Sequence, residues 1–238
     1  MRIGLLSISL AGLVFGAENS INQLGTEQKQ QVESITKDVI LNNPEIIIKS
    51  LQDYDQKRAE SALDKRVQLA LANKDQLFAS ADDPFEGDIN GKTIIAEFLD
   101  YQCGYCKRMH GVIQSFLNKN PKGYKVVYKV IPVLGERSKQ AAITSMSGVK
   151  IGKFKELHTQ LMESGRITDE HIAKIAKDNE LTEDLKRMGE LQLAKNINLM
   201  DRLGVESTPV MYISKPNGTI KIIPGYVDYD DFDAAVKE

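Results

Sequence analysis

Hydrophobic and polar positions at the start of the chain follow a helical period. From about residue 21 to residue 80, apolar residues such as Val32 and Ile35 recur at spacings of three and four. An Asn-Asn-Pro sequence at 42–44 predicts that one helix ends there and another begins, because the residue before proline avoids the α region. No glycine or proline interrupts residues 45–79, so the second helix is predicted to reach roughly 50 Å.

A helix of that length extends beyond a small domain and needs another surface to cover its apolar positions. We therefore interpret residues 17–80 as an oligomerisation arm. The alternative is that the arm folds back on its own domain. The apolar spacing is too irregular to fix the number of chains, although a dimer is favoured over a trimer.

After residue 80 the pattern changes to short strand-like runs between helical stretches. Residues 82–92 have the composition of a linker with turns. The next run, TIIAEFL at 93–99, has apolar side chains on both faces except at Glu97, which describes a central strand covered on both sides. A helix, a strand, a group of helices, a hairpin and a last helix are then predicted at 104–118, 124–133, 136–200, 209–223 and 228–237, with helix breaks near Gly152, Gly165 and Asn179.

The first residues have the pattern of a secretory signal peptide. After Arg2, residues 3–15 are apolar or small, and Val14 and Gly16 occupy the −3 and −1 places of a small-residue cleavage site. The alternative is a buried N-terminal helix. No later apolar stretch is long enough for a transmembrane helix. We therefore expect the mature protein to be soluble in an oxidising compartment, the periplasm.

The composition is that of a globular protein and argues against nucleic-acid binding. Apolar residues make up 42% of the chain and charged residues 27%, which is normal for a protein that buries a core. The formal net charge of -2 provides no basic surface for nucleic acid. The chain also has no tryptophan and few aromatic residues for base stacking. We expect no nucleic-acid partner.

The chain has only two cysteines, Cys103 and Cys106, in the sequence FLDYQCGYCKRMHG. A disulfide between them would close almost no loop and would add little stability as a crosslink. A zinc site usually needs four ligands, and a site of Cys103, Cys106 and His110 is the metal alternative. We interpret His110, His158 and His171 as surface or core residues, and expect no metal and no cofactor.

Both cysteines lie where the predicted central strand passes into a helix. Cys103 would lie at the helix N-terminus, where unpaired backbone N–H groups and the helix dipole stabilise a thiolate. Such placement lowers a cysteine pKa from ~8.5 to between ~3.5 and ~7. Cys106, one turn later, would resolve a mixed disulfide formed at Cys103. The pattern therefore predicts a working redox pair.

The sequences EFLDYQCGYCKR and STPVMYI, separated by a helical insertion, resemble the DsbA-type branch of thioredoxin-fold disulfide oxidoreductases. The resemblance covers about residues 84–238 and implies an α/β thioredoxin fold with an inserted helical subdomain. It implies that Pro209 is cis beside the redox pair and that the Thr208 backbone pairs with an extended substrate. It also implies that Glu97 is a buried acid and a proton acceptor for Cys106. The alternative is that Glu97 reaches solvent or pairs with a lysine.

The dipeptide between the cysteines differs from that of dedicated DsbA oxidases. It is Gly104-Tyr105, not the Pro-His that is typical of dedicated DsbA oxidases. CGYC together with Thr-Pro resembles the disulfide isomerase DsbC, so Gly104, Tyr105, Thr208 and Pro209 are the expected substrate-binding residues. The N-terminal arm instead resembles the helical segment of Com1-like and ScsC-like proteins, which can be oligomeric.

The predicted organisation is a signal peptide at 1–16, a helical oligomerisation arm at 17–80, and a catalytic domain at 81–238 with a helical insertion at about 136–200. The predicted function is an exported thiol:disulfide oxidoreductase that forms or isomerises disulfides. The expected partners are unfolded or misfolded exported proteins, a DsbB-like or DsbD-like membrane protein, and further copies of the chain. The alternatives are a monomeric dedicated oxidase, a thiol-based copper-binding or copper-tolerance protein, and a holdase chaperone.

Overall fold

The structure is a computed structural model that describes residues 24–238. The described residues divide into two units, with the boundary between Glu60 and Ser61. The predicted signal peptide lies outside the described residues. No helix in the described part of the chain combines the length and the apolar character that crossing a membrane requires.

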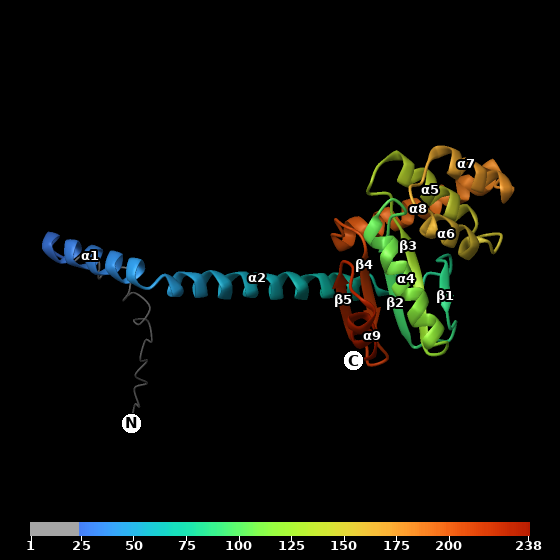
Figure 1. Cartoon of the computed structure of the whole chain (residues 1–238). Coiled ribbons are helices and arrows are strands. Elements are labelled where there is room, and N and C mark those ends of the chain that lie inside the picture. The colour runs from blue at the N-terminus through green and yellow to red at the C-terminus, as the bar shows by residue number, and fades with distance from the viewer. Residues whose placement is uncertain (1–23) are drawn as a thin grey trace, which may run out of the picture. The chain divides into compact units, whose positions relative to one another are not determined.

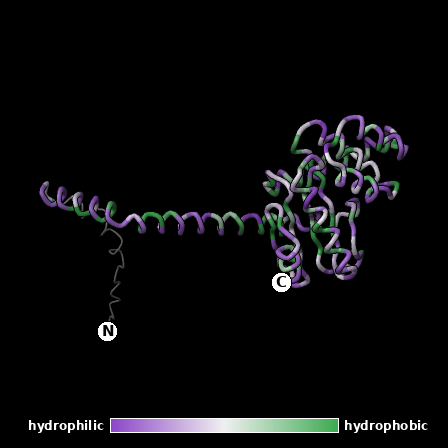
Figure 2. The backbone as a smooth tube through the Cα atoms, in the orientation of Figure 1, coloured by the Kyte–Doolittle hydropathy of each residue, from purple (hydrophilic) through white to green (hydrophobic). Residues whose placement is uncertain are grey.

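The first unit is helical. α1 (Thr26–Asn42) is followed after one residue by α2 (Pro44–Ala72), so the predicted helix break is confirmed. The side-chain amide of Asn43 donates to the Val39 carbonyl oxygen at 2.8 Å, which satisfies a carbonyl at the end of α1. No residue of α1 is buried. Figure 2 shows hydrophobic positions recurring along both helices.

The boundary between the units lies inside α2, earlier than the predicted arm boundary at residue 80. α2 ends before the predicted residue 79, and the short helix α3 (Lys74–Phe78) follows it. Ala70 and Leu77 are fully buried, and they pack with residues of the central sheet in one apolar cluster. The last part of the helical segment therefore belongs to the core of the second unit.

A five-stranded sheet forms the centre of the second unit. Its order is β1 (Phe85–Gly87), β3 (Tyr124–Val130), β2 (Thr93–Leu99), β4 (Val210–Ser214) and β5 (Ile220–Pro224). β2 and β3 are parallel, and the other neighbouring pairs are antiparallel. The predicted central strand and the predicted hairpin are confirmed.

The edge strand β1 corrects the prediction of a linker at 82–92. Three residues are too few to show an alternating pattern, and Glu86 alone of the three is buried. The Tyr128 hydroxyl of β3 donates to the Glu86 carboxylate at 3.1 Å, which joins β1 to its neighbour through side chains as well as the backbone.

Helices cover both faces of the sheet (Figure 1). Alternate residues of β2 point to opposite sides. Ile95 and Leu99 join an apolar cluster with α4 (Gly104–Lys119) and α9 (Tyr229–Lys237). Ala96 and Phe98 join the other cluster, with α3 and α8 (Glu183–Leu203). The central strand is therefore buried on both sides, as its pattern predicts.

The helical insertion consists of α5 (Glu136–Ser147), α6 (Phe154–Glu163), α7 (Asp169–Asp178) and α8, which gather at one end of the sheet in Figure 1. The breaks predicted near Gly152, Gly165 and Asn179 each lie between two of these helices. α8 ends at Leu203, and the residue that follows it, Gly204, has a φ of 62°, a left-handed conformation that glycine adopts without steric cost.

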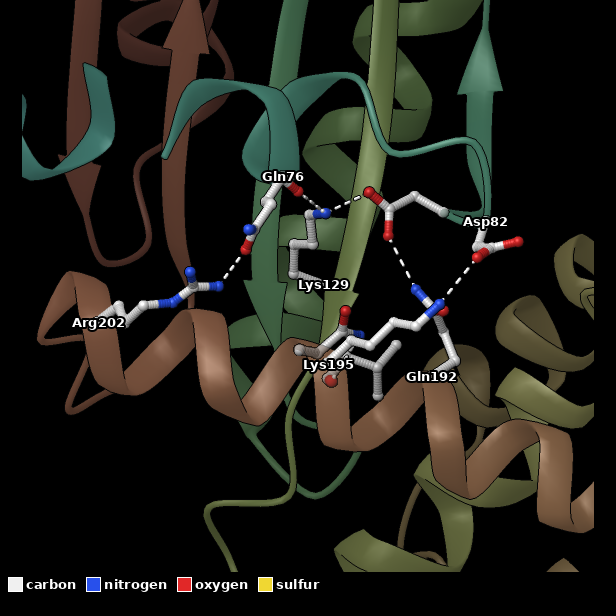
Figure 3. A network of polar contacts seen from close by, with 9 residues as sticks. Gln76, Asp82, Lys129, Gln192, Lys195 and Arg202 are labelled. Atoms are coloured by element: carbon white, nitrogen blue, oxygen red, sulfur yellow. Dashed lines mark hydrogen bonds and ion pairs between the residues drawn. The ribbon is translucent and has the colours of Figure 1, made fainter. Parts of the chain in front are cut away.

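A buried polar network joins the sheet to α3 and α8 (Figure 3). Lys129 of β3 is 1% exposed, pairs with the Asp83 carboxylate and donates to the Gln76 carbonyl oxygen at 2.5 Å. The Gln192 side-chain amide of α8 donates to Asp83 at 3.0 Å. Burial raises the pKa of Asp83 and lowers the pKa of Lys129, so each charge depends on the other.

Candidate active site

Cys103 lies at the point where the chain enters α4. It is the N-cap residue of this helix, and its Sγ accepts a hydrogen bond from the Cys106 backbone N–H at 3.3 Å. Cys103 is 8% exposed and Cys106 is fully buried, and both thiols are free. Cys103 is therefore the thiol that a substrate can reach.

The surroundings separate the pKa values of the two thiols. A hydrogen bond with the Cys106 thiol is the largest cause that lowers the pKa of Cys103 to about 5. Hydrogen bonds with Thr208 and with the backbone N–H groups of Cys106 and Tyr105 lower it further, whereas burial raises it. Burial raises the pKa of Cys106 far above its ordinary value, and the Cys103 sulfur and the charge of Glu97 raise it further. At neutral pH the reduced pair is thus a thiolate at Cys103 and a thiol at Cys106.

Glu97 is fully buried on β2, between Ile95 and Leu99 on the face that α4 covers. Among the described residues, neither of its carboxylate oxygens has a hydrogen-bond partner. Burial, followed by the charges of Cys103 and Glu86, raises the pKa of Glu97 to about 8. The alternative of a solvent-exposed or lysine-paired Glu97 is therefore wrong.

The segment before β4 brings a second part of the chain to Cys103. The Thr208–Pro209 peptide bond is cis, as the resemblance implies. In its neutral form the Cys103 thiol donates to the Thr208 carbonyl oxygen, with Sγ and O 3.4 Å apart. Pro209 leads directly into β4, which pairs with β2. The pairing of these strands therefore places Thr208 and Pro209 beside the redox pair.

Gly104 and Tyr105 begin α4 on the exposed side of Cys103. Tyr105 is 55% exposed. Among the described residues, apart from the neighbours of Gly104 in the chain and the backbone of its own helix, no atom lies within 4 Å of the place that a Cβ on Gly104 would occupy. Both residues thus face open space next to the accessible sulfur, where a bound substrate could contact them.

Asp100 organises the loop before Cys103 and is a site residue that the sequence prediction lacks. Its Oδ1 accepts hydrogen bonds from the Gln102 backbone N–H and the Ser138 hydroxyl, each at 2.7 Å. Its Oδ2 accepts from the Leu134 backbone N–H at 3.0 Å. The bond to Gln102 is the local turn that aspartate commonly forms, so an aspartate at the end of a buried strand is the signal that could have identified it.

Two histidines are buried near α4. His158 is fully buried and His110 is 4% exposed, and their ring centroids are 5.0 Å apart. The Tyr101 hydroxyl lies 3.0 Å from His158 Nδ1. Burial lowers the pKa of both imidazoles, and His110 lowers that of His158 further. The interpretation of these two histidines as core residues is confirmed, while His171 lies half-buried in α7.

Replacing the His158 imidazole is expected to make folding less sensitive to acid. An unfolded histidine takes up a proton below ~6.5, whereas buried His158 stays neutral to lower pH. As the pH falls below ~6.5, the unfolded chain therefore binds more protons than the folded protein, and the folded state loses stability through this group. His158→Phe should reduce the slope of the unfolding free energy between pH ~6.5 and ~5, measured by urea denaturation.

Phe154 provides a matched control, because its ring stacks on His158 with centroids 5.2 Å apart. Phe154→Leu changes the packing around the imidazole and keeps the imidazole itself. This variant should retain the slope of the parent protein. A slope that changes as much in Phe154→Leu as in His158→Phe would contradict the assignment of the acid sensitivity to His158.

Comparison with known proteins agrees with the fold and the cysteine geometry. The sequence model of the thioredoxin-like domain family matches residues 88–238. The chain belongs to the thioredoxin-like family. Comparison with the curated proteins found no match.

Solved structures similar to this thioredoxin-like chain include a linker-deletion variant of ScsC from Proteus mirabilis. It is 27% identical, the match covers 90% of this chain and 96% of that chain, and the TM-score is 0.66. A periplasmic thioredoxin-like protein from Salmonella enterica serovar Typhimurium is 28% identical over 69% of this chain and 93% of its own, with a TM-score of 0.61. BcfH from the same organism covers 89% of this chain and 95% of its own; at 21% identity and a TM-score of 0.73 it shows the fold alone.

These comparisons place the chain in the ScsC-like branch of the thioredoxin superfamily, with a fold like that of thiol:disulfide oxidoreductases. The predicted thioredoxin fold with inserted helices is confirmed. An accessible thiolate three residues before a buried thiol is an arrangement that suits thiol:disulfide exchange.

Proposed function

We propose that the protein is an exported thiol:disulfide oxidoreductase that forms and isomerises disulfides in other exported proteins through Cys103 and Cys106. The separation of the two thiols carries this proposal: the accessible one has a pKa lowered to about 5, and the buried one has a raised pKa. The signal-peptide pattern at 1–16 supports export. The periplasmic location given for the similar Salmonella protein also supports it.

In disulfide formation, a substrate thiolate attacks Sγ of Cys103 in the oxidised pair. The bond between Cys103 and Cys106 breaks, and its electron pair leaves on Cys106. The Cys106 thiolate takes a proton, for which buried Glu97 is the donor because its raised pKa keeps it mostly protonated at neutral pH. A second substrate thiolate attacks the mixed disulfide and releases the Cys103 thiolate. Two electrons have then passed from the substrate to the pair, and a membrane redox partner removes them.

In isomerisation, the reduced pair acts. The Cys103 thiolate attacks a substrate disulfide and releases one substrate thiolate, which attacks elsewhere in the substrate and finally frees Cys103. If this fails, Cys106 attacks Cys103 and releases a reduced substrate, while the carboxylate form of Glu97 accepts the Cys106 proton. The Thr208 backbone, next to the Cys103 sulfur, would hold the substrate segment as an added strand.

The helices of the first unit support a homo-oligomeric form of this enzyme. Large hydrophobic side chains stay exposed on α1 and α2 without covering neighbours from the described chain: Val32, Ile35, Val39, Ile40, Leu41, Ile46, Ile47, Ile48, Leu51 and Tyr54. Exposed apolar side chains gathered on neighbouring turns, unlike single scattered ones, indicate a surface that binds another protein chain. Burying it between copies would bring several Cys103 thiolates to one bound substrate and raise their effective concentration.

Removing residues 1–60 is expected to convert the protein into a folded monomer with altered activity. The second unit keeps its core when the chain starts at Ser61, because Ala70 and Leu77 remain. Compared with residues 17–238, the truncated protein should retain oxidation of a reduced substrate and lose isomerisation of a scrambled multi-disulfide substrate by roughly tenfold or more. Light scattering and both assays on the same preparations measure this.

Two variants keep the test specific. Leu51→Lys in the 17–238 protein places a charge on the exposed apolar surface and should reproduce the effects of truncation. Cys103→Ser should abolish both activities while leaving the oligomer intact. A truncated protein that stays oligomeric, or that isomerises as well as the longer chain, would refute the role of the arm. Trapping the redox state of the pair in cells would then separate oxidase duty from isomerase duty.

A further inference from the structure

An exposed arginine packs against two tyrosine rings that are also close to each other. The Cζ atom of Arg108 is 4.3 Å from the centroid of the Tyr105 ring and 5.3 Å from that of the Tyr226 ring. The two ring centroids are 6.2 Å apart. Tyr105 is 55% exposed and Tyr226 36% exposed. A guanidinium stacked on aromatic faces is oriented by them and keeps its N–H edges free for a carboxylate.

One half of this cluster comes from the helix that Cys103 caps. Tyr105 lies between the two cysteines, and Arg108 follows it by three residues on the same helical face. Helical side chains lean toward the N-terminus of their helix. The Arg108 guanidinium is therefore carried back over Tyr105, toward the end of α4 at which the Cys103 sulfur lies.

The other half comes from the strand pair that follows the cis-proline. Val210, the residue after Pro209, is paired with Pro224 of β5. Tyr226 comes two residues after Pro224. It therefore lies at the end of the sheet where Pro209 meets the redox pair, and the cluster borders the surface to which a substrate segment must bind.

Arg108 is the cation of this surface that is left for a ligand. Within residues 24–238, no carboxylate lies within 4.0 Å of its guanidinium, whereas Arg137 and Arg187 each have an aspartate partner. The neighbouring Lys107 is engaged, since its Nζ donates to the carbonyl oxygens of Ser164 and Gly165 at 2.6 Å each.

We propose that Tyr105, Arg108 and Tyr226 form a selectivity site that favours substrate segments with an Asp or Glu side chain next to the reacting cysteine. The carboxylate pairs with the free edge of the guanidinium, and the tyrosine rings cover its methylene groups. This inference rests on the proposed function, in which Cys103 attacks the substrate. The net charge of the whole chain is -2, so a preference for acidic segments cannot come from its overall field.

The test compares three peptides that differ only in the residues flanking a single cysteine: Glu, Gln or Lys. The cysteine carries a 2-thiopyridyl disulfide. The Cys103 thiolate attacks the peptide sulfur and releases the pyridinethiol, whose absorbance gives the rate for the reduced 17–238 protein. At low salt the Glu peptide should react about threefold faster than the Gln peptide, and the Gln peptide faster than the Lys peptide, as one exposed ion pair allows. At ~1 M salt, where the Debye length is ~3 Å, the ratios should approach one.

Each variant is judged by the ratios of its rates with the three peptides, because a change in the reactivity of Cys103 itself alters all three rates equally. Arg108→Gln should bring the three rates together, and Arg108→Glu should invert their order. Lys119→Gln is the matched control, because it removes a cation that stacks on Tyr229 at 3.8 Å at the far end of α4, ~24 Å along the helix from Cys103. This control should keep the ratios of the parent protein.

The outcomes separate the two proposals. Equal rates for the three peptides in the parent protein at low salt would overturn the selectivity site and leave thiol exchange at Cys103 intact. A preference for Glu that persists in Arg108→Gln would overturn the assignment to Arg108. Failure of every peptide to react, while the thiols are reduced, would instead overturn the proposed function.

Discussion

Alkylation of the reduced protein at pH 6 is expected to label Cys103 at least about a hundred times faster than Cys106. With its pKa lowered to about 5, Cys103 is about 90% thiolate at this pH, and the thiolate is the species that reacts. Cys106 is fully buried with a strongly raised pKa, so it is a thiol without access to the reagent. Quenched labelling followed by fragment mass spectrometry gives both rates.

The Cys106 thiol is the largest single cause of the low Cys103 pKa, which gives a second measurement. Cys106→Ala should raise the pKa of Cys103, followed as the pH dependence of its labelling rate or of thiolate absorbance. The remaining backbone N–H groups at the start of α4 should still hold that pKa below ~8.5. Equal labelling of both cysteines in the parent protein would eliminate Cys103 as the nucleophile.

Glu97→Gln is expected to stabilise the folded protein at pH 7 by about 3 kcal/mol. Glu97 has a folded pKa raised from 4.5 to about 8 by burial. Between these values the unfolded chain has lost a proton that the folded protein keeps, so the contribution of Glu97 to stability is complete below pH 4.5 and is lost as the pH rises toward 8. The neutral glutamine avoids this loss, at about 1.4 kcal/mol per pH unit above 4.5. Urea denaturation of both proteins at pH 4.5 and pH 7 measures the difference.

The same variant should slow thiol exchange although it stabilises the fold. Without a proton donor for the leaving Cys106 thiolate, opening of the oxidised pair by a small thiol at pH 7 should be slower by about tenfold or more. The exposed Glu156→Gln is the control and should change neither quantity measurably. A Glu97→Gln protein that is less stable than the parent at pH 7 would show that Glu97 is ionised and compensated in the folded state.

The position of the two cysteines at the end of a buried strand and the start of a helix could be predicted from the sequence because its signal is local. Two cysteines one helical turn apart, after a run with apolar side chains on both faces, indicate a strand that ends at a reactive helix terminus. The same run marked Glu97 as its one charged position, but the burial of Glu97 was expected only from the family resemblance. The approach of Thr208 to Cys103 depends on the pairing of β4 with β2, which no local pattern encodes, and only the family resemblance supplied it.

The sequence pattern could not predict which residues pack together through tertiary contacts. The helical period that describes the arm continues into Ala70 and Leu77, although these residues pack on the sheet of the second unit. Periodicity indicates that one side of a helix is buried, but it does not indicate which part of the molecule buries it. Tyr226 likewise gains its place beside Arg108 from the pairing of β4 with β5, because the residues next to it in the sequence have no regular structure.

Both cysteines of the chain belong to the proposed redox pair, and no other cysteine is present to form a structural disulfide. Two apolar clusters, one on each face of the sheet, hold the fold together instead. In the proposed exported form, the chain can therefore fold before any oxidant has acted on it, and a reducing environment removes no crosslink from its core. When a reduced copy meets an oxidised copy, the Cys103 thiolate of the first can attack only one disulfide of the second, the one between Cys103 and Cys106. Such an encounter exchanges electrons between identical centres, a degenerate reaction that leaves the redox balance of the population unchanged.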